Sequence, residues 1–141
     1  MSLTRTLFTK VKSSRDAKVL AILLLVFIFC DILLSPVGFE TRAPAIFRDP
    51  SSLPWLGILF GGLILNVVSL LLVFFRPRIA SVLSMIGTIV YLIPLIADQE
   101  HIFTPLAPPP LIADVEGVTA VVLLGVFISA VRLYGKLRRS N

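Results

Sequence analysis

The stretch PWLGILFGGLILNVVSLLLVFF, Pro54 to Phe75, has the length and apolar character of a helix that crosses a lipid bilayer. Three similar runs accompany it, and the predicted spans cover about 17–36, 53–75, 79–97 and 117–135. Because lipid offers no hydrogen-bond partners, each run is predicted to be a helix. We expect an all-α, integral membrane, four-transmembrane-helix antiparallel bundle forming a single membrane domain over residues 1–141, with outer loops at 37–52 and 98–116.

The composition points to the same solvent. Hydrophobic residues make up 57% of the chain and charged residues 15%. Soluble domains average roughly 45–50% apolar and about 25% charged residues. A chain of this kind has too few polar groups to cover its apolar surface in water. The net charge of +5 comes from basic residues at the ends of apolar runs, which favours membrane orientation over nucleic-acid binding.

Charges flanking the predicted spans indicate an orientation. Of the 13 Lys and Arg residues, all but Arg42 and Arg48 lie on the side of the two termini, where Asp16 is the one acidic residue. The positive-inside rule therefore predicts both termini in the cytoplasm and a multi-pass protein of the cell membrane. The basic residues expected to contact lipid are Arg5, Lys10, Lys12, Arg15, Lys18, Arg138 and Arg139.

Two interpretations remain open for the N-terminal region. Residues 1–16 are cytoplasmic and basic, and Leu3, Leu7 and Phe8 are spaced as in a short interfacial helix. The alternative is a cleaved signal peptide, but the apolar stretch is longer than the usual 7–15 residues, and a small-residue site appears only at Ala43 and Ala45.

Glycines interrupt the second span at positions suited to helix packing. Gly57 and Gly61 form a GxxxG pattern on one face, while Gly62, Asn66 and Ser69 share another. Lipid does not drive helices together by the hydrophobic effect, so small residues that permit close approach do so instead. The predicted helix-packing residues are Gly57, Gly61, Gly62, Ser84, Gly87, Gly125 and Ser129.

Polar residues in the other spans suggest an intramembrane polar site. Ser81, Ser84, Gly87, Thr88, Tyr91 and Asp98 fall on one stripe of the third span, and Asn66, Ser84 and Ser129 are at similar depth. Asp31 and Tyr91 also match in depth and can hydrogen-bond. The candidate site comprises Asp31, Asn66, Thr88 and Tyr91. The simpler alternatives are that Ser and Thr bond their own helix and that Asn66 only joins helices.

Asp31 is the residue most suggestive of chemistry. A charge at the centre of a membrane helix costs about 2.5–3.5 kcal/mol and by default marks a functional site. A protonatable carboxyl group there suits a proton-coupled carrier. The alternative is that Asp31 lies at the solvated end of its span or pairs with Arg42 or Arg48.

The second outer loop contains the one histidine of the chain. Asp98, Glu100, His101, Asp114 and Glu116 are weak candidates for a metal site, because their spacing matches no strong pattern. Pro105, Pro108, Pro109 and Pro110 predict a stiff, extended loop. No nucleophile–base pair, phosphate-binding loop or haem-binding pattern is present, and we expect no cofactor.

These features favour a protein that acts by helix association and is not an enzyme. Its expected partners are the lipid bilayer and other membrane proteins. It is predicted to be either an accessory or structural subunit of a membrane complex or a homo-oligomer. Nucleic acid is not expected as a partner. The alternative is a small oligomeric transporter or channel that uses Asp31 and the Asn66 and Tyr91 polar groups. A membrane enzyme is the third possibility.

Overall fold

The computed structural model describes residues 15–41, 53–100, 102 and 110–139. These residues form the helices α2 (Arg15–Thr41), α4 (Leu53–Leu72), α5 (Pro77–Gln99) and α6 (Pro110–Arg139). Each helix is long and apolar enough to cross a membrane. The all-helical prediction with four candidate membrane spans is therefore confirmed for the described part of the chain.

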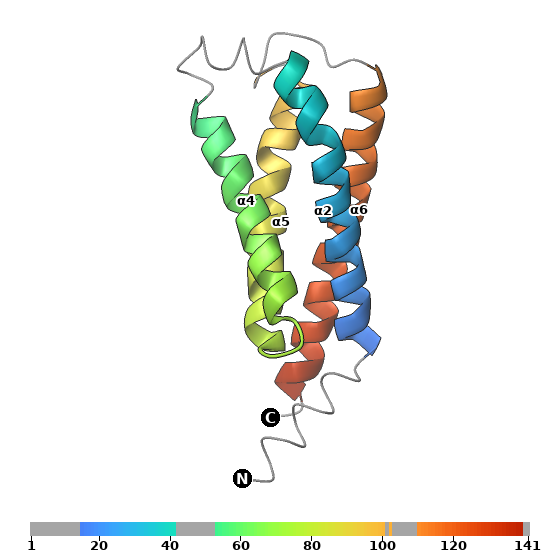
Figure 1. Ribbon diagram of the computed structural model, residues 1–141. Coiled ribbons are helices and arrows are strands. Elements are labelled where there is room, and N and C mark those ends of the chain that lie inside the picture. The colour runs from blue at the N-terminus through green and yellow to red at the C-terminus, as the bar shows by residue number, and fades with distance from the viewer. Residues whose placement is uncertain (1–14, 42–52, 101, 103–109, 140–141) are drawn as a thin grey trace.

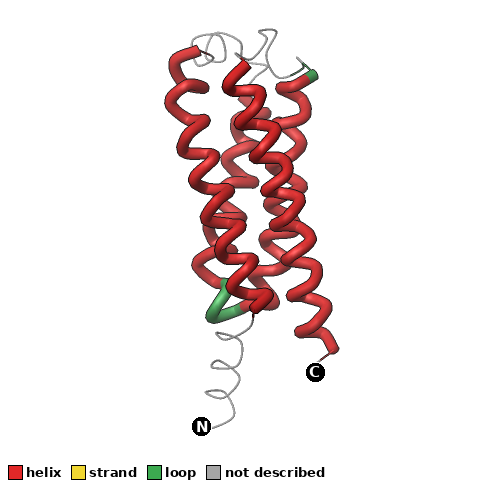
Figure 2. The backbone as a smooth tube through the Cα atoms, turned by 90° about the vertical axis from the view of Figure 1, so that its right-hand side faces the viewer, coloured by secondary structure: helices red, strands yellow, loops and turns green. Residues whose placement is uncertain are grey.

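The helices lie side by side and alternate in direction along the chain (Figures 1 and 2). α4 packs on α5, α5 on α6 and α6 on α2, while α2 and α4 share a smaller contact that completes the bundle. α2 begins and α6 ends at the end that holds the short connection from α4 to α5 (Figure 1). We call this the turn end, and the opposite one the far end.

The first helix is longer than predicted. We expected the span to end near residue 36 and a loop to occupy 37–52, but α2 continues through Pro36 to Thr41. A proline removes one backbone hydrogen bond, and membrane helices tolerate that loss. Residues 42–52 of the predicted loop lie outside the described residues.

Proline also determines where α5 begins. α4 ends at Leu72, three residues before the predicted limit, and its last carbonyl accepts from the N–H groups of Phe75 and Arg76 at 3.0 and 2.7 Å. α5 then begins at Pro77 instead of residue 79 and ends at Gln99. The first helical position suits proline, since its ring presets φ and no N–H is needed there.

The last helix begins earlier than predicted for the same reason. The expected outer loop 98–116 is helical from Pro110 onward, which corrects the prediction that Pro110 belongs to an extended segment. Asp114 and Glu116 therefore lie on α6, and Asp98 lies on α5. Residues 101 and 103–109 are outside the described part of the chain.

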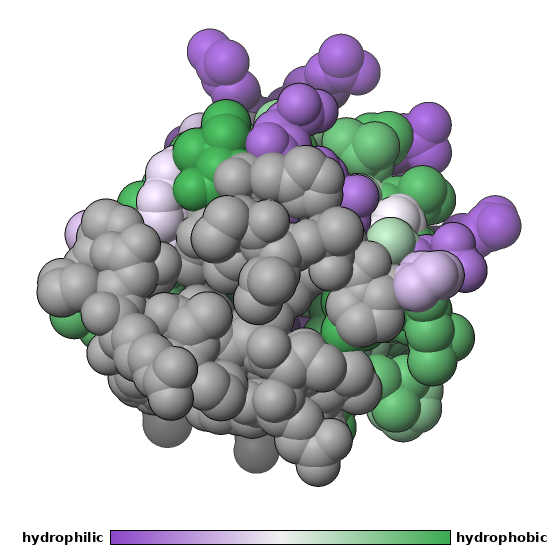
Figure 3. All heavy atoms as spheres, turned by 90° about the horizontal axis from the view of Figure 1, so that it is seen from above, coloured by the Kyte–Doolittle hydropathy of each residue, from purple (hydrophilic) through white to green (hydrophobic). Residues whose placement is uncertain are grey.

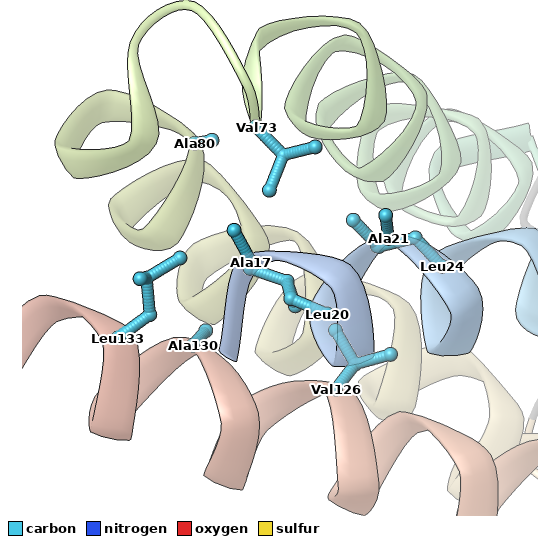
Figure 4. Packing of buried hydrophobic residues seen from close by; sticks show 9 residues of the cluster. All are labelled: Ala17, Leu20, Ala21, Leu24, Val73, Ala80, Val126, Ala130 and Leu133. Carbon is cyan, nitrogen blue, oxygen red and sulfur yellow. The ribbon is translucent and has the colours of Figure 1, made fainter. Parts of the chain in front are cut away.

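Two larger hydrophobic clusters, and a small one around Ala97, fill the bundle. The largest one, at the turn end, joins α2, α5, α6 and the turn after α4 through small and branched side chains: Ala17, Leu20, Ala21, Leu24, Val73, Ala80, Val126, Ala130 and Leu133 (Figure 4). The second one, nearer the far end, comprises Phe27, Tyr91, Leu95 and Leu123. Alanines at the helix contacts let neighbouring backbones approach, which is how helices gain packing energy in lipid.

The outer surface of the bundle is apolar. Phe29, Leu71 and Val121 are 60%, 65% and 68% exposed. Hydrophobic side chains (green) are also visible along the sides in the view from the far end (Figure 3). Soluble monomers rarely expose large continuous apolar patches, so this surface suits a hydrocarbon solvent.

Candidate functional site

α4 and α5 approach most closely at two reciprocal glycine contacts. On α4, Gly62 leaves space for the backbone of Tyr91, because a Cβ at Gly62 would lie 2.7 Å from the Tyr91 nitrogen. On α5, Gly87 leaves space for Asn66, whose Nδ2 would lie 2.9 Å from a Cβ at Gly87. In each helix the glycine and the larger residue are four positions apart, so both fall on the same face. Because the two helices are antiparallel, the glycine of each helix packs against the larger residue of the neighbouring helix.

Serines continue this contact toward the turn end. The Ser69 hydroxyl lies 2.8 Å from the Ala80 carbonyl oxygen and 2.5 Å from the Ser84 hydroxyl. Both interactions join α4 to α5, and the two serines are fully buried. Ser81 differs, since its hydroxyl donates to the Pro77 carbonyl of its own helix at 2.8 Å. The polar stripe on α5 therefore combines contacts between helices with bonds within one helix.

Tyr91 connects α5 to α2 across the bundle. Its hydroxyl donates to Asp31 Oδ1 at 2.5 Å, and both side chains are buried. The ring of Phe27, one turn from Asp31, packs edge-on against the Tyr91 ring at a centroid distance of 4.9 Å. The matched depths of Asp31 and Tyr91 in the sequence thus correspond to a direct hydrogen bond. Asp31 lies inside the bundle, whereas Arg42 and Arg48, its alternative ion-pair partners, lie outside the described residues.

Two buried polar atoms near Tyr91 have no hydrogen-bond partner within the described residues. Asn66 Nδ2 donates to the Gly62 carbonyl of its own helix at 3.0 Å, but Asn66 Oδ1 accepts no bond. Thr88 Oγ1 is likewise without a partner, although Thr88 is 1% exposed. A buried polar group without a partner costs about 1–3 kcal/mol. Asn66 Oδ1 and Thr88 Oγ1 therefore differ from the nearby serine hydroxyls, which are hydrogen-bonded.

Carboxyl groups enter the bundle at the far end. Asp98 and Glu116 are only 3% and 5% exposed, and Gln99 Nε2 donates to Glu116 Oε2. The sequence predicts an outer loop for both acidic residues, but the structure places Asp98 on α5 and Glu116 on α6. Proline at the first position of α6, followed by helix-compatible residues, is the signal by which the helical position of Glu116 can be recognised.

The predicted metal-binding residues do not form a recognisable metal site in the described part of the chain. Within residues 15–41, 53–100, 102 and 110–139, no three His, Cys, Asp or Glu side chains are arranged to hold a metal ion. Glu100 and Asp114 are exposed, whereas Asp98 and Glu116 are buried. His101 lies outside the described residues.

The remaining predicted packing residues differ in their surroundings. A Cβ at Gly57 or Gly61 would meet no atom of the described residues within 4 Å, so this GxxxG face points away from the other described helices. A Cβ at Gly125 would lie 3.5 Å from Leu23 Cδ1, which places Gly125 between α6 and α2. Ser129 is half-buried on α6.

Basic side chains surround the turn end. Arg15, Lys18, Arg138 and Arg139 are exposed there, whereas Arg5, Lys10 and Lys12 lie outside the described residues. Two contacts of basic side chains are found at this end. Lys136 forms an ion pair with Asp16, and the Arg78 guanidinium lies 5.8 Å from the Tyr134 ring centroid.

The described side chains thus offer one buried carboxyl–phenol pair, two unpartnered polar atoms and one outward glycine face. Cys30 is a buried free thiol. No protein-family model, curated protein sequence or solved structure matches the chain.

Proposed function

We propose that the protein is a multi-pass protein of the cell membrane that acts by helix association through the outer face of α4. The observation that carries the proposal is the open GxxxG face, since Gly57 and Gly61 have no neighbour among the described residues within 4 Å on their Cβ side. Glycines spaced in this way let a second helix approach the backbone closely, where van der Waals contact replaces lipid. None of the other described helices packs against the Cβ side of these two glycines.

The rest of α4 supports this proposal. α4 is the least buried of the four helices: 17% of its most apolar stretch is buried, against 28–44% in the other three helices. On the same face, toward the turn end from the glycines, lie Ile64, Val68 and Leu71, which are 58%, 36% and 65% exposed. Together they form a stripe with small residues at the far end and branched side chains toward the turn end. A partner helix, from another membrane subunit or from a second copy, can pack along this stripe.

The proposed orientation places the turn end in the cytoplasm. Exposed Arg15, Lys18, Arg138 and Arg139 support it, because basic residues are enriched on the cytoplasmic side. A cysteine introduced as Asn141→Cys, with the buried Cys30 replaced by alanine, tests it in intact cells or spheroplasts. A membrane-impermeant maleimide should label this cysteine only after the membrane is opened. Labelling in sealed cells would contradict the orientation.

The mass of the native particle in mild detergent tests the association. We expect a particle larger than one 15.4 kDa chain, with every polypeptide in it identified by mass spectrometry. Gly61→Leu should disperse it, because a leucine side chain keeps a partner backbone away. Gly117→Leu is the matched control, since Gly117 also has open space on its Cβ side but lies on α6. A single chain in wild type, or equal dispersal by both variants, would refute the proposal.

A second candidate function is proton-coupled transport, supported by the buried Asp31–Tyr91 hydrogen bond. A carboxyl group inside a membrane bundle can gain and lose a proton as a substrate moves. The test is uptake or flux in reconstituted vesicles with wild type and Asp31→Asn. Asparagine retains an acceptor for Tyr91 but cannot carry the proton. Loss of pH-driven flux with intact assembly would support transport, and no flux in wild type would exclude it under those conditions.

A further inference from the structure

Asn66 and Thr88 bring two complementary polar atoms into the bundle interior. Asn66 Oδ1 can only accept hydrogen bonds, whereas the Thr88 hydroxyl always has one hydrogen to donate. Neither has a partner in the described residues. Asn66 is fully buried and Thr88 is 1% exposed, so neither can reach bulk solvent or lipid headgroups.

The two side chains belong to the same level of the α4–α5 contact. The Asn66 amide packs against Gly87, where a Cβ would lie 2.9 Å from Nδ2. Thr88 follows Gly87 directly, so its side chain begins one residue from that contact. Tyr91 lies one helical turn toward the far end, and Ser84 lies one turn toward the turn end. The polar groups on both neighbouring turns are already hydrogen-bonded.

We infer that Asn66 and Thr88 form a binding site for a single water molecule between α4 and α5. Water accepts from the Thr88 hydroxyl and donates to Asn66 Oδ1, so one molecule satisfies both atoms. Buried waters in proteins serve this purpose, bonding two to four polar groups that would otherwise be unsatisfied. A bridging water is enthalpically nearly as favourable as a direct hydrogen bond.

Water fits these groups better than a cation does. A bound metal ion needs several oxygen ligands and compensating negative charge. The carboxyl group of Asp31 on α2 already accepts from Tyr91. The inferred site is independent of helix association through the outer face of α4, because it faces α5.

The energetic test uses Thr88→Val, which replaces the hydroxyl by a methyl group of similar size. The matched control is Thr119→Val on α6, because Thr119 is equally buried but its hydroxyl donates to the Val115 carbonyl of its own helix at 2.7 Å. If water bridges the pair, Thr88→Val should lower the midpoint of thermal unfolding in mild detergent clearly more than Thr119→Val. Thr88→Ser, which retains the hydroxyl, should recover much of the loss. If the site is dry, Thr88→Val should be neutral or stabilising.

A double-mutant cycle with Asn66→Leu tests whether the two residues act together. Leucine reproduces the branched shape of asparagine without its polar atoms. A bridging molecule makes the two substitutions non-additive, with the second costing less than the first. Additive effects would overturn the inference. Repeating the measurements with sodium and potassium replaced by choline should change nothing, and a wild-type stability that requires either ion would assign the site to a cation instead.

An experimental structure that resolves ordered waters distinguishes a water from a direct contact. We expect density within hydrogen-bond distance of both Asn66 Oδ1 and Thr88 Oγ1. A direct hydrogen bond between the two side chains, or a dry contact, would overturn the inference even if the cycle is non-additive. This measurement uses the wild-type chain, so it remains decisive if the variants fail to fold.

Discussion

Replacing Gly62 by alanine probes the closest approach of two helices in the bundle. The new Cβ would lie 2.7, 2.8 and 2.9 Å from the nitrogen, Cβ and Cα of Tyr91. Ordinary van der Waals contacts of a Cβ begin at 3.4 Å, so α4 and α5 must separate by roughly 0.7 Å at this level. The obstructing atoms are mostly backbone, which cannot rotate away as a flexible side chain can.

The expected change in stability is the balance of two destabilising effects and one stabilising effect. Overpacking a tightly packed contact typically costs about 1–3 kcal/mol. Separation of the helices also weakens the two contacts of the Ser69 hydroxyl, and a hydrogen bond between membrane helices contributes about 0.6–2 kcal/mol. Against this, alanine is favoured over glycine inside a helix by about 0.8–1 kcal/mol. We expect Gly62→Ala to lower the free energy of unfolding by about 2 kcal/mol, as the balance of these terms.

Titration with sodium dodecyl sulfate in mixed micelles, followed by far-ultraviolet circular dichroism, measures this change. The control is Gly117→Ala, because a Cβ at Gly117 meets nothing within 4 Å. The control should be neutral or stabilising, since only helix propensity changes there. Gly62→Ala should therefore destabilise the protein, whereas Gly117→Ala should not. Equal stability of the two variants would refute the close approach of α4 and α5 at Gly62.

Three further predictions concern polar contacts. Tyr91→Phe should lower the free energy of unfolding by about 1–3 kcal/mol, because it leaves the buried Asp31 carboxyl group without its hydrogen-bond donor. Asp31→Asn keeps an acceptor for the Tyr91 hydroxyl and should cost less. Unfolding titrations compare the two variants, and the reverse order would contradict the hydrogen bond between Tyr91 and Asp31. Ser69→Ala removes bonds between helices and should cost about 0.6–2 kcal/mol, while Ser81→Ala removes a bond within one helix and should cost less in the same titration. Lys136→Ala should lower the free energy of unfolding by at most about 1 kcal/mol, and by less in high salt, because its ion pair with Asp16 is partly exposed. A loss of stability that salt does not reduce would contradict this prediction.

Much of the helical architecture could be predicted because hydrophobic length is a direct signal. The predicted limits of the spans differ from the helices mainly where prolines occur. Pro36 lies inside α2, whereas Pro77 and Pro110 begin helices. A proline fits the first turn of a helix and is tolerated within membrane helices, so its presence alone does not say whether a helix ends, continues or begins.

Part of the candidate site could also be predicted. Helical periodicity placed Gly62, Asn66 and Ser69 on one face of α4, and these are the buried residues of that helix. Depth counting paired Asp31 with Tyr91, which are hydrogen-bonded. The inward position of Glu116 was missed, because the start of α6 was placed too late.

Sequence alone determined that four segments are long and apolar enough to be membrane helices, and which residues share a face of each helix, since both follow from hydrophobic length and the 3.6-residue period. Only the tertiary structure decided which neighbour each face meets. Gly62 and Gly87 pack between α4 and α5, whereas Gly57 and Gly61, on the same helix as Gly62, face outward. Periodicity cannot distinguish these faces because lipid is as apolar as the bundle interior, so the inward face is selected by the fit between neighbouring helices.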